Sequence, residues 1–112
     1  LRLGHPLELS TDIGPVIDGK AKQDLIAHAE RMKAAGELLY SAQVPETCVY
    51  GSYLAPMVFE IPRMDLLQRE AFGPILHIVR WQADRMDDVI RAIKASGYGL
   101  TGGVHTRRDG FA

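Results

Sequence analysis

The chain has little of several features that define large protein classes. It has one cysteine, 7% aromatic residues and a formal net charge of −1. A single cysteine cannot form an internal disulfide, which excludes a disulfide scaffold and favours a reducing, cytoplasmic setting. The charge balance, with no Lys/Arg run longer than Arg107-Arg108, gives little electrostatic attraction to nucleic acid or anionic lipid. No apolar run approaches the roughly 18 residues of a membrane helix.

The composition that is present is that of a globular protein. Hydrophobic residues make up 46% and charged residues 24% of the 112 residues, close to the averages for such chains. The length fits one domain or a piece of one. We find no repeat, linker or low-complexity stretch, so we expect no domain boundary within residues 1–112. Because the chain starts at Leu1 and ends just after a polar turn-like stretch, we interpret it as a segment of a longer protein.

Hydrophobic periodicity predicts an α/β fold. Apolar residues spaced three or four apart indicate helices, and short β-branched runs indicate strands. The predicted helices are 18–35, with Asp18 as N-cap and Gly36 as stop, and 84–96, with Asp84 as N-cap and Gly97 as stop; the predicted strands are 38–40, 53–61, 75–81 and 100–106. Strand 75–81, helix 84–96 and strand 100–106 form a βαβ unit. We therefore expect a mostly parallel sheet with flanking helices.

Several motif matches do not lead to a chemical site. The stretch from Gly97 to Gly102 spells G-x-G-x-x-G, but a predicted helix precedes it and a strand follows, which is the reverse of a dinucleotide-binding turn. Cys48 has no histidine near it in sequence, so we interpret it as structural. The four histidines are too far apart for the usual ligand spacing, so we expect no metal site. They are His5, His28, His77 and His105.

The segment before the third predicted strand has a more unusual composition. Glu70 offers two acceptor oxygens, which suit the two adjacent hydroxyls of a ribose. Phe72, two residues on, can lie on the same side of an extended chain and press on a flat heterocycle. Gly73 removes side-chain bulk and Pro74 fixes the direction of the chain. From the residues alone, a solvated Glu70 and a core Phe72 are the favoured interpretation, because most such residues serve solvation or packing.

The same segment resembles a known family. Glu70-Ala71-Phe72-Gly73-Pro74 is similar to the Glu-x-Phe-Gly-Pro motif of aldehyde dehydrogenases. Three flanking stretches also resemble family motifs in the same order: Ile13-Gly14-Pro15-Val16-Ile17, Gly51-Ser52-Tyr53-Leu54-Ala55-Pro56 and Tyr98-Gly99-Leu100. The resemblance covers essentially all 112 residues. Within the family it is strongest to the 1-pyrroline-5-carboxylate dehydrogenase domain of bifunctional bacterial proline-utilisation proteins, over residues 9–18, 72–80, 97–101 and 103–105.

The resemblance implies a role in cofactor binding. In the family, a cysteine thiolate attacks the aldehyde, hydride passes to NAD⁺, and an activated water releases the acid. Of this apparatus the chain matches only the cofactor part: Glu70 would bind the nicotinamide ribose, and Phe72 would contact the nicotinamide. The catalytic cysteine, general base and main NAD-binding domain would lie upstream, and Cys48 does not match the family's cysteine. The resemblance therefore implies no catalytic residue and no metal ligand within these 112 residues.

The implied whole protein is an NAD-dependent enzyme of proline catabolism. It would oxidise L-glutamate γ-semialdehyde, a small aldehyde, to glutamate, and it would be a cytoplasmic homo-oligomer. FAD would be needed only if a proline dehydrogenase domain is also present. The segment alone would be inactive. Two alternatives remain: another aldehyde dehydrogenase, for example one acting on succinate semialdehyde, or a non-catalytic interaction module.

Overall fold

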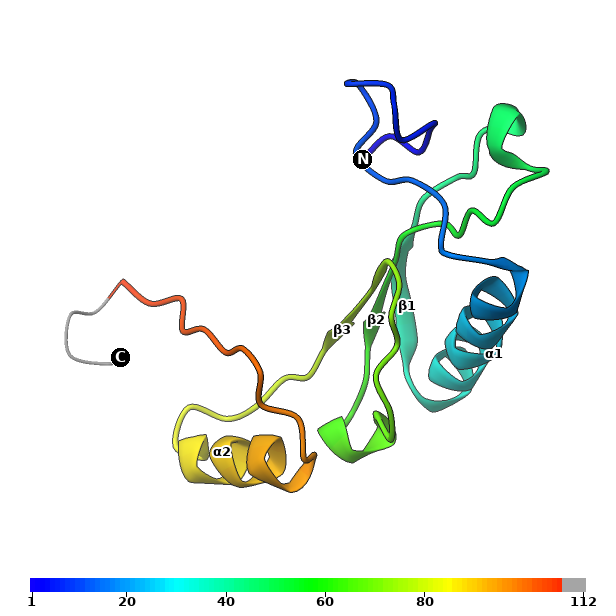
Figure 1. The fold of residues 1–112 in the computed structure, drawn as a ribbon. Helices are drawn as coiled ribbons and strands as arrows, with labels where there is room; N and C mark the ends of the chain where they lie inside the picture. The colour runs from blue at the N-terminus through cyan, green and yellow to red at the C-terminus, as the bar shows by residue number, and fades with distance from the viewer. Residues whose placement is uncertain (108–112) are drawn as a thin grey trace. The chain divides into compact units, whose positions relative to one another are not determined.

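The computed structural model describes residues 1–107, which fall into two compact units that divide between Arg80 and Trp81. The first unit holds one helix, two short 3₁₀ turns and three strands, and the second holds one helix (Figure 1). In chain order the elements are α1 (Gly19–Ala35), β1 (Glu37–Ser41), η1 (Glu46–Cys48), β2 (Met57–Glu60), η2 (Met64–Leu66), β3 (Ile75–Ile78) and α2 (Met86–Ala95).

Helix α1 begins and ends where its sequence predicts. The Asp18 carboxylate accepts a hydrogen bond of 2.7 Å from the backbone N–H of Ala21, which satisfies one of the unpaired donors of the first turn. At the other end, the Gly36 N–H donates to the carbonyl of Met32. A Cβ on Gly36 would collide with the Glu60 carbonyl oxygen, so glycine lets the chain turn closely against the sheet.

The three strands form one mixed sheet in the order β1-β2-β3. Strand β2 pairs antiparallel with β1 and parallel with β3, so Phe59 lies between Leu38 and His77. The register shifts between Leu38 and Tyr40, which leaves Leu39 as an extra residue in a bulge. The α/β class is confirmed, although the sheet has one parallel and one antiparallel pairing where the sequence predicts mostly parallel strands.

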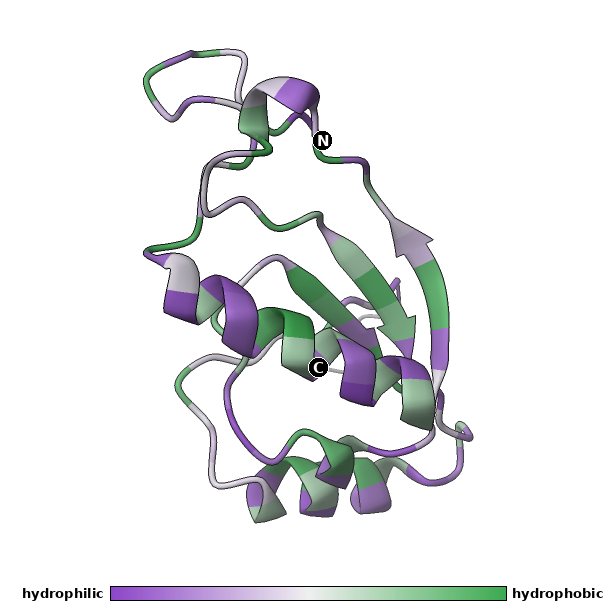
Figure 2. Cartoon of the chain, turned by 90° about the vertical axis from the view of Figure 1, so that its right-hand side faces the viewer, coloured by the Kyte–Doolittle hydropathy of each residue, from purple (hydrophilic) through white to green (hydrophobic). Residues whose placement is uncertain are grey.

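The core lies between α1 and one face of β2. Burial alternates along β2, with Met57 and Phe59 facing inward, as a half-covered strand requires. The side chains of Phe59 and Ile61 are essentially inaccessible to solvent, at 0% and 1% exposure. The remaining buried members of this cluster are Leu25, Ala29, Met32 and Leu54. Figure 2 shows mostly apolar strands behind α1, whereas α1 alternates between polar and apolar along its length.

The helix of the second unit differs from the sequence prediction at its start and agrees with it at its end. Helix α2 begins at Met86, with Arg85 at the N-cap and no side-chain cap, so Asp84 does not cap it. The carboxylate that does form local contacts is that of Asp88, which pairs with the side chains of Arg85 and Arg91. The predicted stop is confirmed, because Gly97 follows α2 with a φ of 75°, a conformation that favours glycine.

The predicted strand 100–106 is not formed in the described part of the chain. Residues 100–106 have an irregular backbone with no ladder partner, so the βαβ unit predicted around α2 is also wrong. A strand exists only where a neighbour supplies hydrogen bonds, which local sequence does not encode. The parallel pair is instead formed by β2 and β3, and the connection between them carries the short turn η2.

Candidate functional site

Glu70 and Phe72 line one pocket in the first unit. The pocket has a volume of about 190 Å³ and lies between α1 and the segment that leads into β3. Its lining residues are Ala21, Asp24, Leu25 and His28 of α1, together with Arg69, Glu70, Ala71 and Phe72. The four helical residues follow the i, i+3, i+4, i+7 spacing of one helix face. The structure therefore brings together the two residues that the sequence proposes for cofactor binding.

Two tight turns shape the segment that carries these residues. The Gly73 N–H donates to the Ala71 carbonyl at 2.9 Å, and the Ile75 N–H donates to the Gly73 carbonyl at 2.8 Å. Both bonds close three-residue turns, so the chain changes direction twice before β3 begins. The Pro74 carbonyl then accepts a hydrogen bond of 3.0 Å from the Met57 N–H, which ties the segment to the start of β2. The backbone around Phe72 is thus fixed from its carboxyl side.

Gly73 also sets how closely the segment approaches α1. A Cβ built on Gly73 would lie 2.5 Å from Cδ1 and 2.9 Å from Cδ2 of Leu25. Carbon atoms in good contact are about 3.5–4.0 Å apart, so no larger residue fits without displacement. Leu25 is itself buried in the core. The absence of a side chain at Gly73 therefore allows the 69–72 segment to lie directly on the helix.

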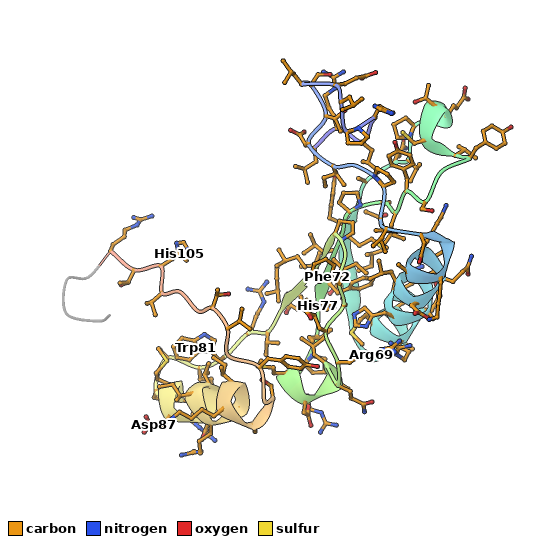
Figure 3. The ribbon with its side chains drawn as sticks, in the orientation of Figure 1. Arg69, Phe72, His77, Trp81, Asp87 and His105 are labelled. Carbon is orange, nitrogen blue, oxygen red and sulfur yellow. The ribbon has the colours of Figure 1, made fainter. Side chains whose placement is uncertain are left out.

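The two site residues present chemically different surfaces. Phe72 is 86% exposed, which is unusual for a large aromatic residue and offers a flat apolar face to a partner. Glu70 is exposed and supplies a carboxylate that can accept hydrogen bonds from two hydroxyl groups. Phe72 therefore does not occupy the core position that the sequence analysis considered for it. Figure 3 shows Phe72 together with two other labelled side chains of the first unit, Arg69 and His77.

Charges around the pocket are mixed. Lys20 donates a hydrogen bond of 2.7 Å to the Asp24 carboxylate and, with its positive charge, holds the pKa of Asp24 below its ordinary value. The more distant charge of Arg69 acts in the same direction. Asp24 therefore stays ionised, and together with Glu70 and Arg69 it gives the lining of the pocket two carboxylates and one guanidinium. This surface suits a ligand with hydroxyl donors rather than a bare anion.

One lining residue of the pocket, His28, pairs with a second histidine, His77, and this pair was not anticipated from the sequence. The Nε2 atoms of His28 on α1 and His77 on β3 are 2.9 Å apart, and the two rings meet edge to face with centroids 5.0 Å apart. His77 also stacks on Phe59, with centroids 6.4 Å apart. His28 is only 4% exposed. The available sequence signal was its place within the apolar stripe of α1, beside Leu25 and Ala29.

Both imidazoles are held in their neutral form. Burial lowers the pKa of His28, and the nearby His77, Arg31 and Arg69 lower it further. Burial alone lowers the pKa of His77. A buried charged ring would lose hydration and, for His28, would also face guanidinium groups. The pair therefore forms a neutral hydrogen bond near pH 7.

The remaining candidates are placed away from any recognisable chemistry. Cys48 is buried at 3% exposure in η1, and its thiol interacts with the hydroxyl groups of Thr47, at 3.8 Å, and of Tyr53, so it has a structural environment. Among residues 1–107, no three His, Cys, Asp or Glu side chains gather closely enough to hold a metal ion. Neither helix in that range has the length and apolar composition needed to cross a bilayer.

Comparison with known proteins places the chain in a family. The family model described as the aldehyde dehydrogenase family matches residues 1–111. Among curated proteins, the bifunctional protein PutA of Klebsiella aerogenes is 42% identical over 113 aligned residues. The alignment covers 96% of this chain but 9% of the relative, so the chain spans about a tenth of the length of that protein.

Solved structures agree in fold as well as in sequence. Proline utilization A (PutA) from Bradyrhizobium japonicum superposes with a TM-score of 0.87 at 46% identity, covering 96% of this chain and 11% of that one. The 1-pyrroline-5-carboxylate dehydrogenase from Thermus, solved with bound NAD, gives a TM-score of 0.79 at 31% identity, covering 96% and 20%. The resemblance drawn from the four sequence motifs is confirmed, and the chain belongs to the aldehyde dehydrogenase family.

Proposed function

We propose that this chain is part of an NAD-dependent dehydrogenase that oxidises L-glutamate γ-semialdehyde to glutamate in proline breakdown. Within it, Glu70 and Phe72 bind the nicotinamide half of the cofactor. The observation that carries the proposal is the pocket in which an exposed aromatic ring and a carboxylate lie together within a family motif. The substrate follows from the similarity to PutA proteins and to 1-pyrroline-5-carboxylate dehydrogenase.

The residues fit such a cofactor by their chemistry. The Glu70 carboxylate accepts hydrogen bonds from the two ribose hydroxyls, which fixes the sugar and with it the ring it carries. The Phe72 ring covers one side of the flat heterocycle and excludes water from it. Gly73 leaves room for the chain to approach α1, as the contact with Leu25 requires. When bound, NAD⁺ supplies the acceptor for the substrate's hydride.

The nucleophile is proposed to come from outside these 112 residues. Covalent oxidation of an aldehyde needs an accessible thiolate. Cys48 is buried and lies beside a threonine hydroxyl rather than a base, so it does not meet that need. The isolated chain is therefore expected to have no activity. Aldehyde-dependent production of NADH by the purified 112-residue chain would contradict this assignment.

The similarities do not favour the two alternatives. A curated betaine aldehyde dehydrogenase of Rhizobium leguminosarum is 33% identical over 108 residues, below the 42% of the PutA relative. A non-catalytic module has no support from either set of relatives. From the family resemblance we further propose that the whole enzyme is a homo-oligomer. The single buried cysteine and the balanced charge of this segment fit a cytoplasmic setting.

The proposal is tested in the full-length protein that carries this chain. Glu70→Gln keeps the shape of the side chain and removes its charge, so it should lower kcat/KM for NAD⁺ by roughly tenfold to a hundredfold. Phe72→Ala should lower it by about threefold to tenfold through loss of the ring contact. The KM for the aldehyde should change less in both variants.

The control for charge removal is Glu46→Gln, at an exposed position in η1. It should leave both KM values unchanged. Wild-type kinetics in Glu70→Gln and Phe72→Ala would refute the assigned roles. A panel of aldehydes, including succinate semialdehyde and betaine aldehyde, tests the substrate, and a preference for either over glutamate γ-semialdehyde would overturn that part of the proposal.

A further inference from the structure

The His28–His77 contact joins two elements that are distant in sequence. His28 lies in the middle of α1 and His77 in β3, and their Nε2 atoms are 2.9 Å apart. At this distance the two nitrogens share one hydrogen bond, because two N–H groups facing each other would repel. One imidazole must therefore donate and the other accept. The contact depends on the protonation of both rings.

The neighbouring arginine assigns the direction of this bond. A guanidinium nitrogen of Arg31 lies 3.4 Å from Nδ1 of His28, and an arginine can only donate. Nδ1 of His28 therefore accepts, and the proton of the neutral ring sits on Nε2. That N–H donates to Nε2 of His77, whose own proton is on Nδ1. This pair of tautomers satisfies both hydrogen bonds, the one between the two neutral rings and the one from Arg31 to His28.

Each added proton removes one hydrogen bond of this arrangement, and which bond is lost depends on the nitrogen that takes the proton. A proton on Nε2 of His77 faces the N–H of His28. A proton on Nδ1 of His28 faces the donor of Arg31. If His28 shifts its proton to Nδ1 in order to accept from a cationic His77, the clash with Arg31 returns. A single proton on Nδ1 of His28 thus removes only the contact with Arg31 and keeps the His28–His77 bond. When both rings carry a proton, two N–H groups face each other and the bond between the rings is lost.

The charged groups around the pair give the added proton little compensation. On α1, Arg31 contacts His28, and Asp24 is already engaged by Lys20. On the facing segment, Arg69 adds positive charge to the surroundings of His28, and Glu70 lies in the wall of the same pocket. Strand β2 contributes only the apolar ring of Phe59, against which His77 stacks. Burial and the arginines both lower the pKa of His28.

The pair is connected to the candidate site on both sides. His28 lines the pocket together with Glu70 and Phe72. His77 lies in the strand that begins immediately after Pro74 and thus shares its backbone path with the site segment. Separation of the two rings would move α1 away from β3 beside the Gly73–Leu25 contact.

We propose that His28 and His77 are positioning residues that hold the 69–72 segment against α1 in the form that binds cofactor, and that acidification releases this segment. The inference rests on the proposed cofactor role of Glu70 and Phe72. Neither histidine touches the cofactor. The pair acts by fixing the helix and strand between which the pocket is formed, so its effect should be larger on cofactor affinity than on aldehyde affinity.

The test uses two substitutions at one position in the full-length protein. In His77→Gln, the amide oxygen accepts from the His28 N–H and does not titrate, so the contact survives acidification. In His77→Leu, the acceptor is lost at every pH. The control is His105→Gln, which removes an exposed histidine outside the pair. The Kd for NAD⁺ and the hydrogen exchange of peptides covering residues 19–35 and 69–78 are measured at pH 8.0 and 5.5, with exchange rates corrected for intrinsic pH dependence.

Wild type and His105→Gln should lose about tenfold in NAD⁺ affinity at the lower pH, and their 69–78 peptide should exchange faster. His77→Gln should retain its affinity within about twofold and show no acid-dependent exchange. His77→Leu should bind weakly and exchange rapidly at both pH values. Recovery of tight binding in His77→Gln but not in His77→Leu separates a hydrogen-bonding role from simple packing.

Two results would overturn the inference. One is equal acid weakening of NAD⁺ binding in wild type and His77→Gln. The other is an acid-dependent change in exchange that persists in His77→Gln. Failure of the proposed function can be distinguished from failure of this inference. If the proposed function is wrong, the wild-type protein binds no NAD⁺ at pH 8.0. The hydrogen exchange of residues 69–78 then still reports whether the histidine pair holds that segment.

Discussion

Replacing Gly73 with alanine tests the closest approach in the candidate site. The new Cβ would lie 2.5 Å from Cδ1 of Leu25, about 1 Å inside normal contact. Overpacking of this kind typically costs about 1–3 kcal/mol, and the stiffer unfolded chain offsets about 0.4–1 kcal/mol of it. We expect a net destabilisation of about 1–2 kcal/mol, expressed as displacement of the 69–72 segment from α1.

Native-state hydrogen exchange of α1 in the full-length protein measures this effect locally. A loss of about 1–2 kcal/mol corresponds to exchange that is about fivefold to thirtyfold faster. The matched control is Gly19→Ala, because a Cβ at Gly19 meets no atom within 4 Å. Leu25→Ala removes the atoms that would clash, so adding it to Gly73→Ala should cost less than the two separate losses combined. Strictly additive losses would show that the two residues do not interact and would refute the reasoning.

Three further predictions concern the core and the charges of the first unit. Phe59→Ala removes a side chain with no exposed surface and should destabilise α1 and the sheet by about 3–5 kcal/mol, measured by the same exchange experiment. Because the folded pKa values of His28 and His77 lie below the ordinary 6.5, the unfolded chain binds more protons as pH falls through that value. The melting temperature should therefore be highest above pH 6.5 and fall below it, and a His28→Gln/His77→Gln double variant should flatten this dependence. Glu60→Gln breaks the exposed ion pair with Arg80 and should leave the melting temperature unchanged at pH 7, whereas a clear drop would show that the pair contributes to stability.

The sequence predicts those parts of the fold that depend on local interactions. Helix α1 was found because its cap, its apolar period and its terminal glycine all lie within the segment, from Asp18 to Gly36. Asp84 was misassigned as a cap because an acidic residue ahead of an apolar stripe gives the same pattern whether the helix begins one or two residues later. The acidic residue that does form local contacts at this end of the helix is Asp88, which pairs with Arg85 and Arg91.

Local sequence patterns could not predict the contacts between segments that are distant in the chain. His28 and His77 are 49 residues apart, and neither forms a local pattern with the other. The strand at 100–106 failed for a related reason, since β-propensity describes a residue's preference and not the presence of a neighbouring strand. The site residues Glu70 and Phe72 came from a family motif, and the structure adds the helix face that they oppose.

The direction of the strands has a consequence for the proposed cofactor site. Parallel sheets usually receive ligands beyond their carboxyl ends, but here that edge of β2 and β3 is taken by the Ile61–Ile78 hydrogen bond of 2.9 Å and the Glu60–Arg80 ion pair. The pocket instead lies where the chain enters β3, and at about 190 Å³ it falls short of the roughly 300–1,000 Å³ of ordinary ligand sites. Under the proposed cofactor role, a pocket of this size would hold one end of a dinucleotide, and other parts of the protein would bind the adenosine half. Exchanging residues 69–78 between relatives should alter how the reactive ring is presented, without altering the choice between NAD⁺ and NADP⁺.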